Sequence, residues 1–186
     1  MHEGTASGIV DQLYQEHQAL VGHLISNGEI SLQVNVDSNF RKTLLLAAAS
    51  YFETALSESL IALFSDRTNS AEPMVEFVRN KAIARQYHTF FNWDRSNANS
   101  FFGLFGSTFS QYMSGEVNND AALDSSIRAF LELGNIRNQL VHQNFASFPL
   151  EKTVDEIYTL YRDALRFVEA FPSKIGDYLD GLASDG

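Results

Sequence analysis

Apolar residues recur at helical spacing over most of this 186-residue chain, and this periodicity limits the fold more than any other feature. Within residues 7–26, for example, Leu13, Leu20 and Leu24 return at intervals close to those of one helix face. No segment alternates apolar and polar residues convincingly over the length of a strand. The sequence therefore predicts an all-α fold.

The boundaries of the predicted helices follow from caps, glycines and prolines. Asn27-Gly28 stops the first helix, and the weakly alternating connector 29–36 is consistent with an extended segment. Asp37 or Ser38 then caps the second helix, and a polar break at 66–73 precedes a third, shorter helix. The four long helices are expected at 7–26, 37–65, 120–144 and 151–179, the last broken or kinked near Pro172.

An aromatic and asparagine-rich segment, 87–112, interrupts the helical pattern. We interpret it as a turn and a short helix that Asn97 or Asn99 caps and Gly106 ends. The chain contains 15 Phe, so most of these rings are expected to pack in the core or at an interface. The alternative is base stacking, for which Tyr87 and Trp93 are the residues most worth testing.

Composition indicates a single globular domain over residues 1–186, with 45% hydrophobic and 19% charged residues. Without cysteine there can be no disulfide, thiolate catalysis or cysteine-ligated zinc. The longest uninterrupted apolar run, 44–49, is far shorter than a membrane span. We therefore expect a cytoplasmic protein that does not bind membranes.

The net charge of −10 argues against broad electrostatic adhesion to nucleic acid. Any RNA contact must be local, and the densest basic patch consists of Arg79, Lys81, Arg85 and Arg95. A solvated helix face is the simpler interpretation of this patch, and a strip facing phosphates is the alternative.

One short polar cluster, Arg137-Asn138 and His142, lies in a segment that otherwise resembles a buried helix. At about 100° per residue, Asn138 and His142 share one face, which Asn135 joins. Arg137 points about 140° away from His142, into the apolar stripe. An arginine there must reach water, meet an acid or face a second surface.

Several enzyme signatures are absent, including zinc-binding His-Glu-x-x-His, phosphate-binding loops and the Gly-x-Ser-x-Gly elbow. We therefore expect no cofactor and no metal site. Of the five histidines, only His142 lies among converging polar residues, and the others are interpreted as incidental. A lone histidine on a helix is more often structural than catalytic.

The segments around Arg137, Asn138 and His142 favour a functional role for this cluster. Arg-Asn-x-x-x-His near the end of a late helix, after Leu-x-Leu-x-x-Ile (131–136) and before Asn144-Phe145, resembles the signature of the HEPN superfamily. The aromatic segment 90–106 resembles the RiboL-PSP type of HEPN domain, and 50–53 on the second helix also fits. Together these similarities extend over about residues 40 to 170.

The resemblance implies an up-and-down bundle of four to five main helices, with one or two short extra ones, that forms a homodimer. It implies a metal-independent endoribonuclease of toxin or antiviral-defence type, with Arg137, Asn138 and His142 as catalytic residues. His142 would transfer protons near neutral pH, and Arg137 would bind the phosphate oxygens. RNA is the expected substrate, and an antitoxin or regulatory protein is a possible partner.

Supporting roles are assigned to Glu53, which could pair with Arg137 or assist the base, and to Asn135. A helix carboxylate with no role in catalysis is an equal alternative for Glu53. For the chain as a whole, the rival interpretation is a non-catalytic HEPN module that binds a nucleotide, RNA or a protein. In a third interpretation Arg137 and His142 are only structural.

Overall fold

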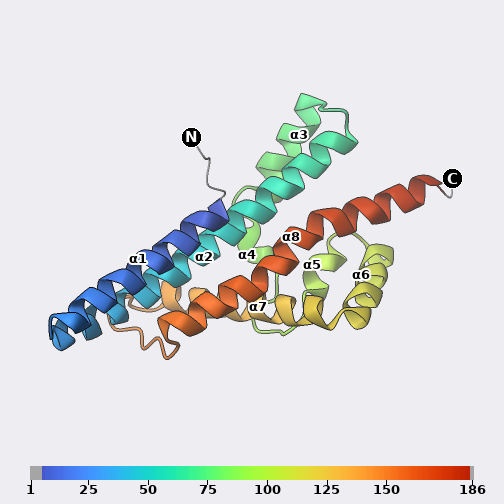
Figure 1. Cartoon of the computed structure of the whole chain (residues 1–186). Helices are drawn as coiled ribbons and strands as arrows, with labels where there is room; N and C mark the ends of the chain where they lie inside the picture. The colour runs from blue at the N-terminus through green and yellow to red at the C-terminus, as the bar shows by residue number, and fades with distance from the viewer. Residues whose placement is uncertain (1–5, 185–186) are drawn as a thin grey trace. The chain divides into compact units, whose positions relative to one another are not determined.

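The computed structural model describes residues 6–184, with side chains from residue 8 onward. It is 81% helical, and residues 6–184 contain no strand, which confirms the all-α prediction (Figure 1). The helices are α1 (Ala6–Ser26), α2 (Ile30–Arg67), α3 (Glu72–Val78), the π-helix η1 (Arg79–Ile83), α4 (Tyr87–Phe90), α5 (Asn99–Gly103), α6 (Ser107–Asn119), α7 (Ala121–His142) and α8 (Val154–Ser184).

The chain divides into two compact units, and α2, α7 and α8 each contribute to both. The first unit comprises residues 1–51 and 133–162, and the second comprises 52–132 and 163–186. The sequence predicts that residues 1–186 fold as one domain. Whether the two units fold together stays a prediction.

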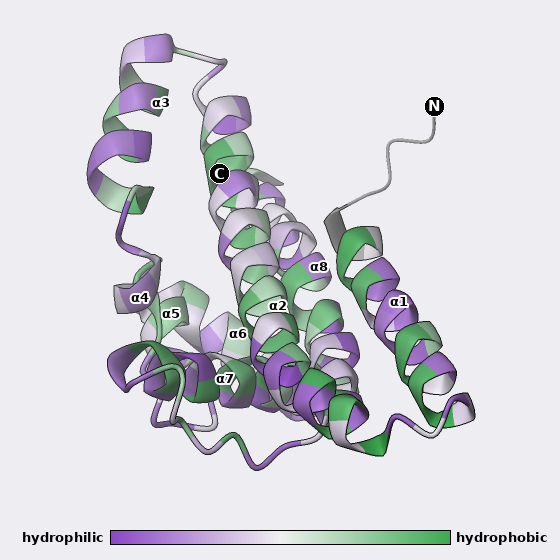
Figure 2. Cartoon of the chain, turned by 90° about the vertical axis from the view of Figure 1, so that its left-hand side faces the viewer, coloured by the Kyte–Doolittle hydropathy of each residue, from purple (hydrophilic) through white to green (hydrophobic). Residues whose placement is uncertain are grey.

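Polar contacts join the helices of the first unit. Tyr14 on α1 stacks on Tyr158 of α8 with ring centroids 3.7 Å apart, and its hydroxyl donates to Asp155 at 2.8 Å. Tyr158 and Arg162 both donate to Asp11. Burial, followed by the hydrogen bond to Asp11, raises the pKa of Tyr158. Figure 2 shows hydrophobic and hydrophilic residues in turn along α1.

The extended connector predicted at 29–36 is wrong, because α2 begins at Ile30. The alternating residues Ile30, Leu32 and Val34 are each about half exposed, so their alternation does not mark a buried face. A strand also needs a neighbour to accept its backbone hydrogen bonds, whereas a helix satisfies them internally. The prediction for the first helix is confirmed, and Gly28 ends it with a φ of 75°.

An aromatic core fills the second unit. Phe101 is fully buried, with ring centroids of Phe91 at 4.5 Å and Phe171 at 4.7 Å. Phe130 and Phe167 pack 5.1 Å apart in the same cluster. The aromatic segment therefore serves mainly as core, as the sequence favoured.

The predicted short helix is α5, but it ends at Gly103, and its N-cap is Ala98 without a side-chain cap hydrogen bond, so the predicted cap by Asn97 or Asn99 is wrong. Gly106, with a φ of 98°, precedes a further helix, α6, that was not predicted.

The helix α8 was expected to break or kink near Pro172; the break is wrong, because α8 runs on to Ser184 with Pro172 inside it, and the kink stays a prediction. A proline inside a helix costs about 3 kcal/mol, since it removes a hydrogen bond and clashes with the preceding turn. The buried residues Phe167, Phe171 and Ile175 lie on both sides of Pro172 and pack on one face. Burial of these side chains offsets the loss. At the start of α8, Thr153 and Glu156 form a reciprocal capping box.

By length and apolar composition alone, α2 is able to cross a membrane. This finding is weak evidence, because a core helix passes the same test. Leu44, Leu45 and Leu56 of α2 are fully buried within the protein, which accounts for part of its apolar character.

Candidate functional site

The predicted catalytic residues occupy the last turns of α7. Asp120 caps the start of this helix by accepting the backbone N–H groups of Ala122 and Leu123, both at 3.0 Å. Toward its end Leu140 is fully buried and anchors the apolar face. Arg137 and Asn138 are half-buried, whereas His142, the last residue of the helix, is exposed.

Arg137 is held by its neighbour in the chain. Its Nη1 donates to Oδ1 of Asn138 at 3.1 Å, and it has no ion pair within the described part of the chain. The guanidinium thus reaches from the apolar stripe to the polar face that was predicted to hold Asn138 and His142. A helical wheel places only the first atoms of a side chain, and an arginine is long enough to reach round to the next residue.

The other polar residues of this face do not hold the imidazole in the structure. Asn135 accepts a hydrogen bond from Gln139 at 3.3 Å, and Asn138 is engaged by Arg137. The imidazole of His142 has no hydrogen bond or ion pair with any residue among 8–184. Its ring is therefore open to a ligand.

Two cations of α2, which the sequence analysis missed, fix the segment that follows α7. Lys42 is 5% exposed, and its Nζ donates to the carbonyl oxygens of Phe145 at 2.7 Å and Ala146 at 3.3 Å. Arg41 donates from Nη1 to the carbonyl of Leu150 at 2.8 Å. Adjacent cations directly before the apolar run 44–49 were the available signal, since a buried cation requires partners.

His17 was interpreted as incidental, and this interpretation is wrong, because the residue is buried beside an acidic partner. It is 4% exposed, and its Nε2 lies 2.7 Å from Oδ1 of Asp37. Its ring stacks on Phe40 at 4.0 Å. The contact joins α1 to α2 inside the first unit, so His17 is a buried structural residue and not an incidental one.

The residues predicted to contact RNA belong to the second unit, whereas the Arg137–His142 motif belongs to the first. Arg79 is paired with Glu76 at 3.0 Å, and Arg85 has a positive φ of 62°. Lys81 and Arg95 are exposed and have no ion pair among residues 8–184.

The two aromatic candidates and Glu53 also lie in the second unit and are half-buried. Trp93 packs against Phe130 with ring centroids 5.8 Å apart, and its Nε1 donates to the carbonyl of His88 at 3.0 Å. Tyr87 packs on Trp93 at 5.7 Å. In the structure both rings contribute to packing.

Among the described residues, no three histidine or carboxylate side chains cluster as a metal site would require. The sequence model of the RiboL-PSP-HEPN family matches residues 11–177. The chain therefore belongs to the RiboL-PSP-HEPN family, and this membership is consistent with a HEPN ribonuclease. No curated protein and no solved structure matches the chain.

Proposed function

We propose that the protein is an endoribonuclease that cleaves RNA without a metal ion, at a composite site formed by two copies of the chain. The observation that carries this proposal is an exposed histidine one turn beyond a linked Arg137–Asn138 pair, at the end of one helix. Family membership adds the expectation of RNA as the ligand.

The reaction would proceed by attack of a ribose 2′-hydroxyl on the adjacent phosphorus. A neutral His142 accepts the hydroxyl proton while the new O2′–P bond forms. The P–O5′ bond then breaks, and the leaving oxygen takes a proton from the equivalent histidine of the second copy. The products are a 2′,3′-cyclic phosphate and a 5′-hydroxyl, and no external nucleophile is consumed.

The guanidinium of Arg137 would stabilise the negative charge that develops on the phosphate oxygens as the phosphorus becomes pentacoordinate. A guanidinium carries five N–H donors, and the structure engages one nitrogen with Asn138. The remaining donors can bind two non-bridging phosphate oxygens at once. Asn138 would thereby act as a positioning residue that holds Arg137, rather than as a group that holds the imidazole.

A second copy is proposed because the mechanism needs a second histidine as the proton donor and because apolar surface beside His142 is exposed. Exposed apolar side chains flank His142, since Val141 and Phe145 are each 46% exposed. Covering these side chains with another copy would remove apolar surface from water at the place where the second motif is needed. Half-burial of Arg137 is also compatible with a surface that a partner completes.

The biological setting proposed is that of a cytoplasmic toxin or antiviral-defence nuclease, kept inactive by an antitoxin or regulatory protein. RNA would also contact the basic residues Arg79, Lys81, Arg85 and Arg95, with Tyr87 and Trp93 as stacking candidates. Glu53 and Asn135 remain candidates for supporting roles.

A non-catalytic binding module is the second candidate function. The observation in its favour is the net charge of −10, which weakens any contact with RNA outside a local site. In that case Arg137 would bind a phosphate group and His142 would not transfer protons.

The test is cleavage of RNA by the purified protein in the presence of a chelator, with mapping of the new RNA ends. His142→Ala and Arg137→Ala should each lower the cleavage rate by about 10²- to 10⁴-fold. His23→Ala is the matched control, because His23 is an exposed histidine of the first unit outside the motif. Light scattering should show the same oligomeric state for all variants.

Cleavage by His142→Ala at the wild-type rate would refute the assignment of the site. Thermal stabilisation by a nucleotide without any turnover of RNA would instead select the binding module.

A further inference from the structure

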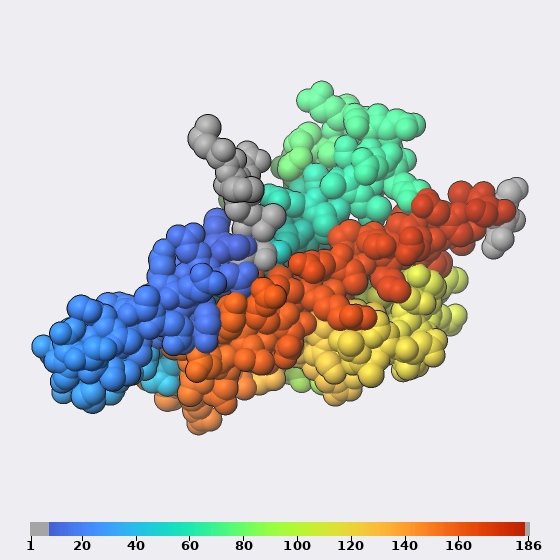
Figure 3. Space-filling model, in the orientation of Figure 1, coloured from blue at the N-terminus to red at the C-terminus, as the bar shows by residue number. Residues whose placement is uncertain are grey.

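A large apolar cavity lies within the second unit, and of its lining residues the proposed function uses Lys81 alone, as a candidate RNA contact. Its volume is about 590 Å³, inside the range of about 300–1,000 Å³ that is usual for small-molecule sites. The end of α2, the segment η1–α4, the α5–α6 region and the C-terminal part of α8 line it. Figure 3 shows one face of the surface formed by α2, α3 and α8.

The lining changes in character from the floor of the cavity to its rim. Phe64 and Phe105 are half-buried and provide a phenylalanine floor, and behind it Phe90, Phe101 and Phe109 are buried, with exposed fractions between 0% and 6%. Leu104 at the rim is 59% exposed although it also lines the cavity. An apolar body inserted here would cover surface that water now contacts.

Both charged residues in the lining are cations, Arg67 and Lys81, and no carboxylate lines the cavity in the described part of the chain. Arg67 is already paired with Asp180 at 2.6 Å. The side chain of Lys81 is exposed and has no hydrogen bond or ion pair within residues 8–184, so its ammonium group is free to pair with an anion. In a protein with a net charge of −10, a cation at the rim of an apolar cavity favours a ligand with an anionic group.

The two hydroxyl groups of the lining, those of Thr89 and Tyr178, are already bonded within the protein, which argues against a ligand with a polar body. The hydroxyl of Thr89 donates to the carbonyl of Gln86 at 2.7 Å, and that of Tyr178 donates to Thr108 at 2.9 Å. A sugar or nucleotide would leave its own polar groups without partners against the phenylalanine floor. A hydrocarbon chain has no such requirement.

The backbone is irregular where Lys81 meets the cavity. Three consecutive residues, Lys81, Ala82 and Ile83, line it, although consecutive residues of an α-helix spread over about 200°. These three residues belong to the π-helix η1, and single π-helical turns are frequent at functional sites.

We propose that this cavity binds a long-chain carboxylate, a fatty acid whose chain lies on the phenylalanine floor and whose carboxylate pairs with Lys81. Arg67 stands at the same rim and keeps its ion pair with Asp180. This site is independent of the Arg137–His142 motif and does not rest on nuclease activity.

The test uses the full chain with dodecanoate as the probe. Thermal unfolding measures the melting temperature, and native mass spectrometry measures the stoichiometry of binding. Dodecanoate should bind saturably at one molecule per chain and raise the melting temperature. Dodecanol, which lacks the charge, should bind about threefold to tenfold more weakly, and dodecyltrimethylammonium more weakly still. Equal binding of all three probes would overturn the role of the cation.

Two variants locate the site. Lys81→Glu should weaken dodecanoate binding at least tenfold, whereas Arg95→Glu, at an exposed arginine of the same unit outside the cavity, should leave it unchanged. Ala82→Trp should fill the cavity and abolish binding without lowering the melting temperature of the free protein.

If Ala82→Trp prevents folding, the charge reversal at the exposed Lys81 still decides the question. Undiminished binding by Lys81→Glu, or the absence of saturable binding to the wild type, would overturn the proposal. Displacement of dodecanoate by an acidic amphipathic peptide that binds more tightly would show that a protein helix is the natural occupant, and would also overturn it.

Discussion

Both units of the molecule bury apolar side chains and form ion pairs, but the surroundings of their candidate sites differ. The first unit, which contains the Arg137–His142 motif, joins its helices through hydrogen-bonded and charged groups such as His17–Asp37 and Lys42. The second unit is built around phenylalanine rings and encloses an apolar cavity. The difference teaches that polar contacts fix the segment that follows the motif, whereas the cavity is apolar apart from a few polar groups, of which the cation Lys81 is proposed to select the ligand.

The largest effect is expected in the aromatic core. Phe101→Ala removes a fully buried ring and should lower the free energy of unfolding by about 3–5 kcal/mol. Phe77→Ala is the control, because Phe77 is 66% exposed and its loss should change stability by less than about 0.5 kcal/mol. Chemical denaturation measures both values.

Hydrogen exchange on Phe101→Ala sharpens the comparison between the units. Loss of protection in the second unit alone would show that the units unfold separately, against the prediction of one domain. Equal loss in both units would show one cooperative domain. A change in stability no larger than that of Phe77→Ala would contradict the central place of the aromatic core.

A smaller effect is expected for Lys42→Met, which keeps the apolar stem but removes the donor to two carbonyl oxygens. The loss should be about 1–3 kcal/mol, because the carbonyls lose a charged partner at a buried site. Limited proteolysis should detect loosening of the segment after α7, at Phe145–Leu150. Lys81→Met is the matched control, since this exposed lysine has no bonded partner within residues 8–184. Equal stability and equal proteolysis of the two variants would refute the anchoring role.

The sequence was sufficient for the fold class and for the existence of the four long helices, because periodicity and turn residues act locally, but the 13-residue helix α6 was not predicted. The start of α2 was missed because Ile30, Leu32 and Val34 are exposed, so their spacing is not set by burial. The continuity of α8 through Pro172 depends on packing against residues distant in the chain, which overrides local preference.

The candidate site was predictable as a set of residue types but not as an arrangement. The Arg137–Asn138 hydrogen bond depends on the rotamers of long side chains, which helical spacing does not specify. The partners of Lys42 are backbone carbonyls more than 100 residues away, and no motif encodes them. The cavity has no sequence signature, because its lining comes from segments that are apolar in any case.

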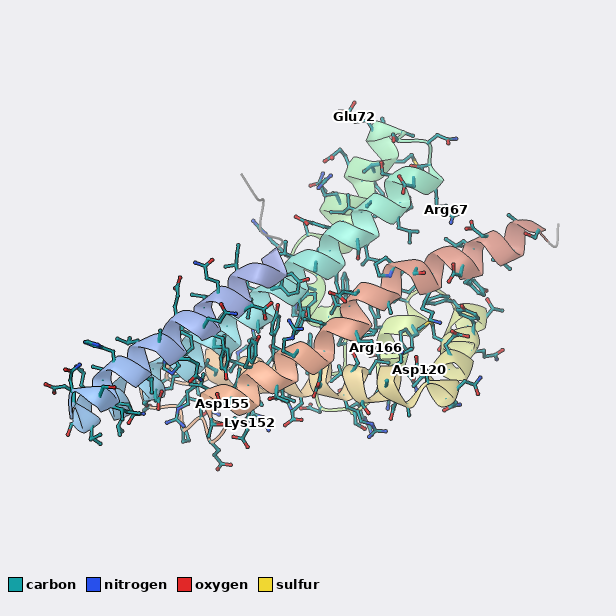
Figure 4. The ribbon with its side chains drawn as sticks, in the orientation of Figure 1. Arg67, Glu72, Asp120, Lys152, Asp155 and Arg166 are labelled. Atoms are coloured by element: carbon teal, nitrogen blue, oxygen red, sulfur yellow. The ribbon has the colours of Figure 1, made fainter. Side chains whose placement is uncertain are left out.

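The smallest effect on stability is expected at the surface of the second unit, where Arg166 donates to Asp120 at 2.7 Å (Figure 4). This hydrogen bond, together with those from the backbone N–H groups of Leu123 and Ala122, lowers the pKa of Asp120 below its usual 3.8. A carboxyl whose pKa is lower in the folded state stabilises the fold above its unfolded pKa, and loses that contribution as the pH falls through its folded pKa. Asp120→Asn keeps the helix cap but removes the charge, so it should lower the melting temperature slightly at pH 7 and leave it unchanged at pH 2. Thermal unfolding at the two pH values and at high salt checks this expectation, and a difference that persists at pH 2 would mean that the ion pair is not its cause.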